Sequence, residues 1–185
     1  MDRRDRTYLT PITGELPVQV LYAAETLRER LAELGQQISE DLLEHDLVVV
    51  APLNGSLLFL CDLVRKIELP LRYELIQVEF SDEDDGDTVR TIEYPIPFDL
   101  ENDTVLLVRD ITTTGVIENY LREQLLQKGA AAVRVVTLVD FRQERTTEFN
   151  PDYIGFAPPR SGKLIGYGIK DEGRFGNLPF IGQLG

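Results

Sequence analysis

The segment VLLVRDITTTGVIENYL, residues 105–121, decides the fold class of this 185-residue chain. Its first four residues are apolar without interruption, which is typical of a strand buried on both faces of a parallel sheet. Asp110 follows the strand closely, and the turn Thr112–Gly115 leads into an amphipathic helix over residues 116–128. A buried strand, a compact turn and a helix together form the first part of a βαβ unit. The segment therefore predicts an α/β fold.

A second unit of the same kind precedes it. Residues 47–51 (LVVVA) predict another buried strand, and Leu53-Asn54-Gly55 turns the chain. Ser56 then stands where it can cap a helix that runs to about residue 67. Two strand–turn–helix units in one chain indicate a sheet whose strands are mainly parallel.

The remaining elements complete this sheet and its helices. Leucine and isoleucine recur every three or four residues over 22–45, which predicts an amphipathic helix with Gly35 as a candidate interruption. Further strands are predicted at 71–80, 133–139, 153–156 and 164–169. The fold class is therefore α/β, a mainly parallel twisted sheet flanked by helices, and the late strands without helices between them predict a small antiparallel lobe.

The composition is that of a folded protein with a strong acidic excess. The chain carries 19 Lys and Arg against 32 Asp and Glu, a net charge of −13, and 43% of its residues are hydrophobic. Polyanions repel such a chain, so neither nucleic acid nor an anionic membrane surface is expected as a partner. With no apolar run of about 20 residues and no secretory signal, we expect a cytoplasmic protein. The single cysteine, Cys61, is expected in the core, on the apolar face of its helix.

The turn after the strand at residues 105–108 has the groups that bind a phosphate. Its backbone N–H groups and the helix N-terminus form a cradle for an anion, and the hydroxyls of Thr112, Thr113 and Thr114 can donate to it. Gly115 lets the backbone approach closely, and Asp110 can accept from sugar hydroxyls or hold a metal. The alternative interpretation is a threonine-rich turn with an N-cap, in which Asp110 caps the turn or pairs with its neighbour.

Several ordered segments resemble one known family. The 105–121 segment looks like the phosphoribosyl-pyrophosphate (PRPP) loop of the type I phosphoribosyltransferases, and the segment order resembles their hypoxanthine-guanine branch. LVVVAPLNGSLLFLCDLVRKI (47–67) resembles the strand and pyrophosphate loop of that branch. VVTLVDF (135–141) matches the strand after the PRPP helix, and residues 151–182 resemble the purine-binding hood. The resemblance runs from Leu16 to Gly182.

The resemblance implies a role for each part of the site. It places pyrophosphate on Leu53, Asn54, Gly55 and Ser56, and the ribose hydroxyls and Mg²⁺ on Asp110. It places the 5′-phosphate on Thr112, Thr113, Thr114 and Gly115. Arg109, where the chain departs from the family, is expected to contact an anion directly in place of a metal. It places the purine on Lys163, Leu164 and Ile165, and a second metal contact on Asp171. The catalytic residues implied are Asp110 and Thr113.

The chain departs from the family at chemically important positions. Arg109, Thr113 and Lys170 stand where the family has acids, and Thr113 replaces the Asp that takes or shares a purine proton. Leu164 replaces an aromatic residue that stacks on the base. Two basic positions of the family are also lost, at Asn150 and Gly176. These changes leave the phosphate cradle intact but weaken the case for a metal at Arg109 and Lys170.

The expected organisation is one phosphoribosyltransferase-like domain, residues 1–185. It has an N-terminal arm (1–17), a mobile flap (81–99) and a hood contribution (150–185). The expected activity is transfer of a phosphoribosyl group from PRPP to a 6-oxopurine in purine salvage, by a homodimer or homotetramer that uses Mg²⁺. The alternative is a catalytically impaired protein of this fold that binds a purine nucleoside monophosphate or PRPP as a sensor or regulatory partner.

Overall fold

The computed structural model describes residues 18–53, 55–80, 89–93 and 98–184. The chain divides into two compact units. The larger unit holds Arg30–Ser161, and the smaller one joins the residues before Arg30 to those from Gly162 onward. The expected hood boundary at residue 150 thus differs from the observed division, because the strand at 153–156 pairs within the larger unit.

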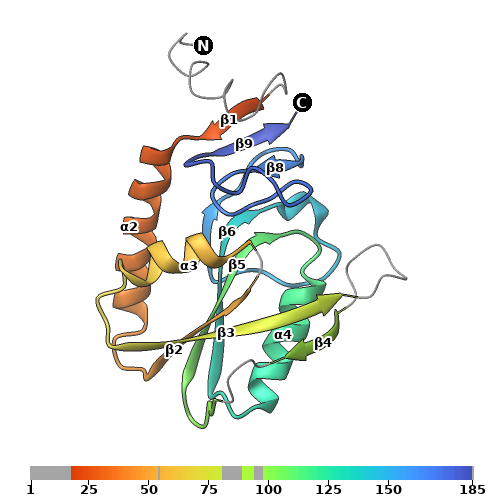
Figure 1. The fold of residues 1–185 in the computed structure, drawn as a ribbon. Coiled ribbons are helices and arrows are strands. Elements are labelled where there is room, and N and C mark those ends of the chain that lie inside the picture. The colour runs from red at the N-terminus through yellow and green to blue at the C-terminus, as the bar shows by residue number, and fades with distance from the viewer. Residues whose placement is uncertain (1–17, 54, 81–88, 94–97, 185) are drawn as a thin grey trace. The chain divides into compact units, whose positions relative to one another are not determined.

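A six-stranded sheet forms the centre of the larger unit (Figure 1). Its strands are β2 (Leu47–Pro52), β3 (Leu71–Phe80), β4 (Val89–Glu93), β5 (Thr104–Thr112), β6 (Ala132–Asp140) and β7 (Tyr153–Phe156). The strand order is β4-β3-β2-β5-β6-β7. All neighbours are parallel except β3 and β4, which are antiparallel. This confirms the predicted α/β class.

Three α-helices accompany the described strands: α2 (Ala24–Asp41), α3 (Leu57–Val64) and α4 (Val116–Gln127). A short 3₁₀ helix, η1 (Arg142–Glu144), follows β6. The crossover β2–α3–β3 moves in one direction along the sheet, and β5–α4–β6 moves in the other. Because such crossovers are right-handed, opposite directions place α3 and α4 on opposite faces of the sheet.

The core between α4 and the sheet consists of aliphatic side chains that alternate along the strands. Val48 and Val50 of β2, Val105 and Leu107 of β5, and Leu121 of α4 belong to one buried cluster. Every residue of β2 is buried, and the first six residues of β5 are too. This is the continuous burial that the apolar runs predicted, since a parallel sheet is covered on both faces.

The predicted interruption of the first helix at Gly35 is wrong. α2 runs unbroken through this residue. A Cβ atom at position 35 would lie 2.4 Å from the backbone oxygen of Lys66. Glycine is therefore required by a close approach between α2 and the segment after α3, and the helix geometry itself is undisturbed.

The smaller unit contains a three-stranded antiparallel sheet in the order β1-β9-β8. Its strands are β1 (Val18–Tyr22), β8 (Leu164–Ile165) and β9 (Ile181–Leu184). The antiparallel lobe is confirmed, but the strand predicted over 164–169 ends early. Gly166, Tyr167 and Gly168 all have positive φ angles, which turn the chain away from the extended conformation.

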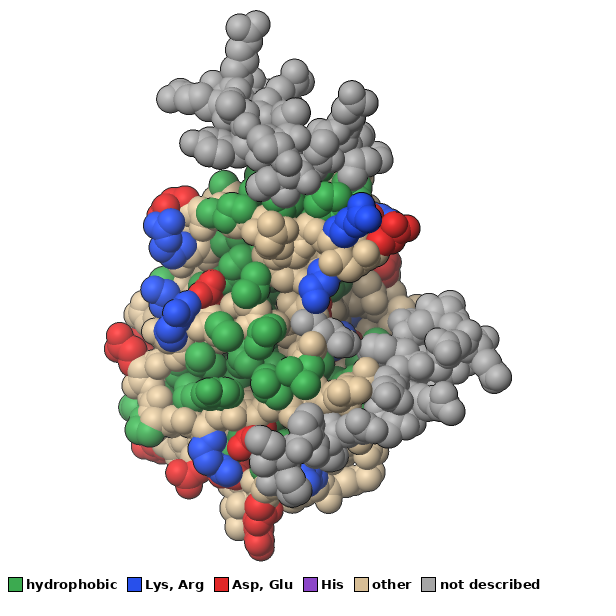
Figure 2. Space-filling model, in the orientation of Figure 1, with side chains coloured by type: hydrophobic (Ala, Val, Ile, Leu, Met, Phe, Trp, Pro, Cys, Tyr) green, Lys and Arg blue, Asp and Glu red, His purple; other side chains and the backbone are tan. Residues whose placement is uncertain are grey.

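The prediction that Cys61 lies in the core is wrong, because its side chain is exposed. Leu53, Leu57 and Leu58 beside it are also between 40 and 43% exposed. Figure 2 shows hydrophobic side chains gathered on the surface over α3. The apolar face of α3 that packs on the sheet is formed instead by Phe59 and Leu63.

Two expectations fall outside what the structure describes: the arm at residues 1–17, and the parts of the flap at 81–88 and 94–97. Of the flap, β4 is described, paired with β3 through Val78 and Ile92. Among the described helices, none has the length and apolar character needed to span a membrane.

Candidate functional site

The predicted site lies at the carboxyl ends of β2 and β5. From β2 the chain continues to β3 on one side, and it later returns as β5 on the other side of β2. The two strands pair in parallel from Leu47 and Thr104 onward. Adjacent strands whose connections leave in opposite directions form a topological switch point, where ligands bind in open α/β sheets. The two turns that follow β2 and β5 are the turns selected from the sequence.

Gly55 and Asp110 bring these two turns into contact. A Cβ atom at position 55 would lie 1.9 Å from Oδ2 of Asp110 and 3.0 Å from its Cγ. The absence of a side chain at Gly55 therefore gives the carboxylate its position. Among the described residues, no ion pair or hydrogen bond engages this carboxylate. The alternative in which Asp110 pairs with Arg109 does not occur, because Arg109 has another partner.

The turn after β2 also holds a buried hydroxyl group. Ser56 is fully buried, and its Oγ has no hydrogen-bond partner among the described residues. It precedes α3 directly but makes no side-chain cap, so the predicted capping role is not observed. A buried hydroxyl without a partner costs free energy that a ligand oxygen at this turn would recover. Leu53 is partly exposed, and Asn54 lies outside the described residues.

Arg109 is directed into the protein. Its Nε donates to Oε1 of Glu118 at 2.8 Å, and the two side chains are only 9% and 3% exposed. Glu118 lies in the first turn of α4, where a negative charge also favours the helix dipole. The pair ties the end of β5 to the start of α4. This corrects the expectation of an anion contact, since burial of an arginine requires a partner and Glu118 supplies it.

Thr112 also differs from its predicted role. It is the last residue of β5 and fully buried, and its hydroxyl donates to Oγ1 of Thr137 at 3.0 Å. The hydroxyl is therefore directed along the sheet toward β6 rather than toward a ligand. Phosphate binding by the hydroxyls of Thr113 and Thr114 and by the backbone of Gly115 stays a prediction, whereas the Thr112 hydroxyl is engaged within the sheet.

The carbonyl groups of this turn are held from one side. The guanidinium of Arg145 donates to the oxygen of Thr113. The oxygen of Thr114 accepts from the N–H of Thr146 at 3.1 Å and from Oγ1 of Thr147 at 3.0 Å. In a trans peptide the N–H points opposite to the C=O of the same unit. The N–H groups of Thr114 and Gly115 are consequently directed away from residues 145–147.

Gly115 makes this arrangement sterically feasible. It has a φ of +83°, and a Cβ there would lie 2.6 Å from Oγ1 of Thr147 and 2.8 Å from Cβ of Phe149. α4 begins at the next residue, Val116, whose N–H donates to Oγ1 of Thr114 at 3.4 Å, so the N-terminal end of the helix adjoins the turn. Backbone donors of a turn and of a helix N-terminus together form an anion site.

Sequence reasoning missed two residues of this region. Asp140 ends β6 and is 2% exposed, and it forms an ion pair with Arg145. One signal was present in the sequence: Asp140 stands at the carboxyl end of the strand next to β5, which is the same sheet edge as Asp110. Arg145 follows η1 in an irregular segment, so no periodicity marks it.

The predicted purine-binding residues lie in the smaller unit. Lys163 donates to Asp171 at 2.6 Å, and the hydrogen bond to this carboxylate raises the pKa of Lys163. Leu164 and Ile165 form β8 with 5% and 0% exposure, so their side chains belong to the core of that unit. The purine and metal roles of Lys163 and Asp171 stay predictions. The structure adds that the two residues form one ion pair.

Mg²⁺ prefers oxygen ligands, carboxylates among them. Among the described residues, no three His, Cys, Asp or Glu side chains form a group that could hold a metal ion. Asp110 is half-buried at the β2–β5 turns and has a carboxylate without a described partner. Mg²⁺ is commonly bound by one or two carboxylates together with substrate phosphates. The residues therefore fit a Mg²⁺ ion held jointly by Asp110 and a bound diphosphate.

Comparison with known proteins places the whole fold in one family. Residues 18–171 match the family model of the phosphoribosyl transferase domain. The chain is 32% identical over 170 residues to the hypoxanthine-guanine phosphoribosyltransferase of Lactococcus lactis, which covers 90% of both chains. It is 28% identical to a hypoxanthine phosphoribosyltransferase structure from Staphylococcus aureus, with a TM-score of 0.85 and 94% of both chains covered.

A third relative is much longer than this chain. The bifunctional protein TilS/HprT of Listeria monocytogenes is 32% identical over 170 residues, and the match spans 90% of this chain but only 26% of that protein. The match to the family model, the relatives and the site at the β2–β5 turns agree. The chain belongs to the type I phosphoribosyltransferase family, in its hypoxanthine-guanine branch.

Proposed function

We propose that this protein is a purine phosphoribosyltransferase that transfers the phosphoribosyl group of PRPP to a 6-oxopurine in purine salvage. The observation that carries the proposal is the contact between Gly55 and Asp110. It joins the two turns that the family uses for pyrophosphate and for the ribose phosphate. The names of the relatives support the choice of a hypoxanthine- or guanine-type base.

Each part of the site has a proposed task in this reaction. The bond from C1′ of the ribose to the pyrophosphate oxygen breaks, and a bond from C1′ to a purine nitrogen forms. The turn 53–56 holds the pyrophosphate through backbone N–H groups and the free hydroxyl of Ser56. Asp110 accepts from the ribose hydroxyls, and Thr113–Gly115 hold the 5′-phosphate. Lys163 donates to the exocyclic oxygen of the purine.

Asp110, together with oxygens of PRPP, would hold Mg²⁺. When bound, it neutralises charge that develops on the departing pyrophosphate. Asp110 meanwhile fixes the ribose for attack by the purine, because its carboxylate is positioned by Gly55. The proton that the purine loses has no carboxylate acceptor at Thr113. We expect it to pass to water, with a rate about 10²- to 10⁴-fold below that of a site with a general base.

A second candidate is a protein of this fold that binds PRPP or a purine nucleotide without turnover. Two observations favour it: Thr113 replaces the acid that takes the purine proton, and Arg109 is sequestered by Glu118. In this case the backbone cradle remains functional while the chemistry is lost, and the protein acts as a sensor or regulatory partner.

A paired assay separates the two candidates. Calorimetric titration with PRPP, GMP and IMP, with and without Mg²⁺, measures binding, and PRPP-dependent nucleotide formation measures turnover. The transferase proposal predicts both signals. Thr113→Asp is expected to raise turnover, because it supplies a general base. Arg145 bonds the backbone oxygen of Thr113, so the substitution leaves this hydrogen bond in place. Binding without nucleotide formation in both variants would favour the sensor. No binding of any phosphate ligand would contradict both.

The apolar surface over α3 supports a further part of the proposal, a homodimer or homotetramer. Leu57 and Leu58 of α3, and Leu53 shortly before it in the sequence, are partly exposed. One apolar surface patch of this kind is a common feature of an interface between subunits. Light scattering, which measures molecular mass, tests it on the wild type and on Leu57→Asp. The wild type is expected to be an oligomer and the variant to have a smaller mass. Equal masses would show that this surface is not part of the interface.

A further inference from the structure

The side chain of Arg145 bonds the turn Thr113–Gly115 through a backbone carbonyl group, on the side opposite to the N–H groups of the turn. It donates to the backbone oxygen of Thr113 and to Oδ1 of Asp140. The side chain is 9% exposed and that of Asp140 is 2% exposed. Its guanidinium also lies 5.4 Å from the ring centre of Phe149. Three separate contacts thus fix its orientation in a protected position.

We propose that Arg145 is a positioning residue for the 5′-phosphate of the ligand. The inference rests on the proposed function, because it assigns to Arg145 the orientation of the N–H groups that receive that phosphate. Arg145 does not touch the phosphate itself. It holds the carbonyl of Thr113 on one side of the turn, so that the N–H of Thr114, in the same peptide unit, is presented on the other.

The neighbouring residues hold the carbonyl group of the next peptide unit in the same way. The N–H of Thr146 and the hydroxyl of Thr147 both donate to the oxygen of Thr114. The N–H of Gly115 is thereby directed to the same side as that of Thr114. Two successive peptide units are fixed in advance, and preorganised donors need no rearrangement when the anion binds. Asp140 in turn fixes Arg145, and a guanidinium suits this double task because its N–H groups form a rigid fork.

This assignment predicts an effect confined to one ligand group. In Arg145→Met the Thr113–Thr114 peptide loses its anchor and the N–H of Thr114 loses its alignment. We expect the affinity for ribose 5-phosphate to fall about 10- to 100-fold, since one hydrogen bond to a charged group has about that value. The affinity for inorganic pyrophosphate, which the turn at 53–56 receives, is expected to change less than about twofold.

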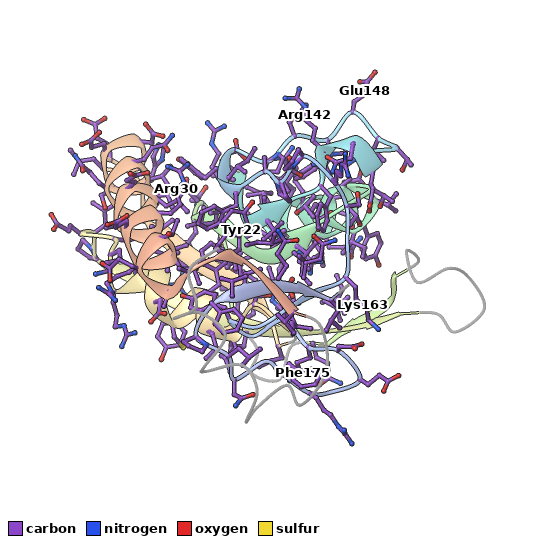
Figure 3. The ribbon with its side chains drawn as sticks, turned by 90° about the horizontal axis from the view of Figure 1, so that it is seen from above. Tyr22, Arg30, Arg142, Glu148, Lys163 and Phe175 are labelled. Atoms are coloured by element: carbon purple, nitrogen blue, oxygen red, sulfur yellow. The ribbon has the colours of Figure 1, made fainter. Side chains whose placement is uncertain are left out.

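A matched control comes from the same segment. Arg142 lies three residues earlier in η1, is exposed, and points outward from the protein in Figure 3. Arg142→Met removes the same charge and volume without reaching the turn. It is expected to bind ribose 5-phosphate and pyrophosphate as the wild type does, which separates a positional effect from a general loss of positive charge.

A second variant distinguishes the loss of positioning from a loss of fold stability. Arg145→Met leaves the buried Asp140 without a partner, which destabilises the fold. The double variant Asp140→Asn/Arg145→Met removes the unpaired charge and leaves no donor at position 145, and its melting temperature should recover toward that of the wild type. Our proposal predicts that its affinity for ribose 5-phosphate stays at least about tenfold reduced, because no guanidinium fork holds Thr113.

Calorimetric titration of these proteins with ribose 5-phosphate and with pyrophosphate decides the matter. Equal ribose 5-phosphate affinity in wild type and the double variant would overturn the positioning role, as would a parallel loss for both ligands. Wild-type protein that binds ribose 5-phosphate but forms no nucleotide would overturn the transferase proposal alone. The comparison between variants would then still test Arg145.

Discussion

Gly55→Ala is the substitution that probes the junction of the two turns most sharply. A Cβ at this position would lie 1.9 Å from Oδ2 of Asp110, whereas real Cβ contacts essentially never fall below 3.0 Å. The carboxylate or the turn must therefore move by at least the difference, 1.1 Å. A displacement of about 1 Å at a reacting group lowers the rate about 100-fold. We expect a loss of that size in PRPP-dependent nucleotide formation.

The structure also predicts that this loss depends on Asp110. The added methyl group would lie 3.5 Å from Cβ of Asp110, which is an ordinary contact. In an Asp110→Ala background the alanine at position 55 therefore fits without displacement. The double variant should show the affinity for PRPP of Asp110→Ala alone, so the two effects are strongly non-additive.

The assay is a double-mutant cycle on PRPP affinity, measured by calorimetry, with nucleotide formation as a second readout. Melting temperatures of all four proteins show whether each is folded. Wild-type affinity and turnover in Gly55→Ala would show that the turn has room for a Cβ atom beside Asp110, contrary to the 1.9 Å approach. Additive losses in the double variant would likewise show that Gly55 acts independently of Asp110.

Three further substitutions test the fold around the site. Arg109→Met leaves Glu118 buried without a partner and should lower the free energy of unfolding by about 3–5 kcal/mol, as measured by urea denaturation; a change below about 1 kcal/mol would contradict the buried pairing. Burial raises the pKa of Tyr153 to about 12, so the stability that its raised pKa contributes is complete below about pH 10 and is lost as the pH rises through 12. Alkaline unfolding of Tyr153→Phe should therefore depend less on pH in that window, and identical curves would count against the shift. Gly35→Ala should destabilise the fold because its Cβ would lie 2.4 Å from the oxygen of Lys66, and a melting temperature equal to the wild type would argue against this close approach.

The sequence predicted most of the sheet because buried parallel strands leave an unmistakable pattern. β3 and β7 have the predicted bounds, and the apolar runs at β2 and β5 are buried throughout their predicted lengths. Local patterns could not show that Gly35 serves a contact with a distant segment rather than a helix break. They also could not give β5 its full length, since Arg109–Thr112 are mostly polar and join the sheet through pairing with β6.

The sequence predicted the turns at Gly55 and Asp110, but it did not predict the direction of every side chain next to them. The turns at Gly55 and Asp110 were assigned to one site by the family resemblance, and the structure adds that the strands before them are neighbours in the sheet. The directions of Arg109 and Thr112 depend on the buried partners Glu118 and Thr137, which only the packed structure supplies. Arg145 was missed for the same reason, since its role comes from a backbone oxygen and leaves no motif in the sequence.

A single-turnover experiment shows directly whether the protein transfers the phosphoribosyl group of PRPP to a purine. The purified protein is placed in excess over PRPP and Mg²⁺ is added with hypoxanthine, so that even slow chemistry without a base at Thr113 accumulates product. We expect IMP and pyrophosphate to form together in amounts equal to the PRPP supplied. Bound PRPP that yields neither product would contradict it.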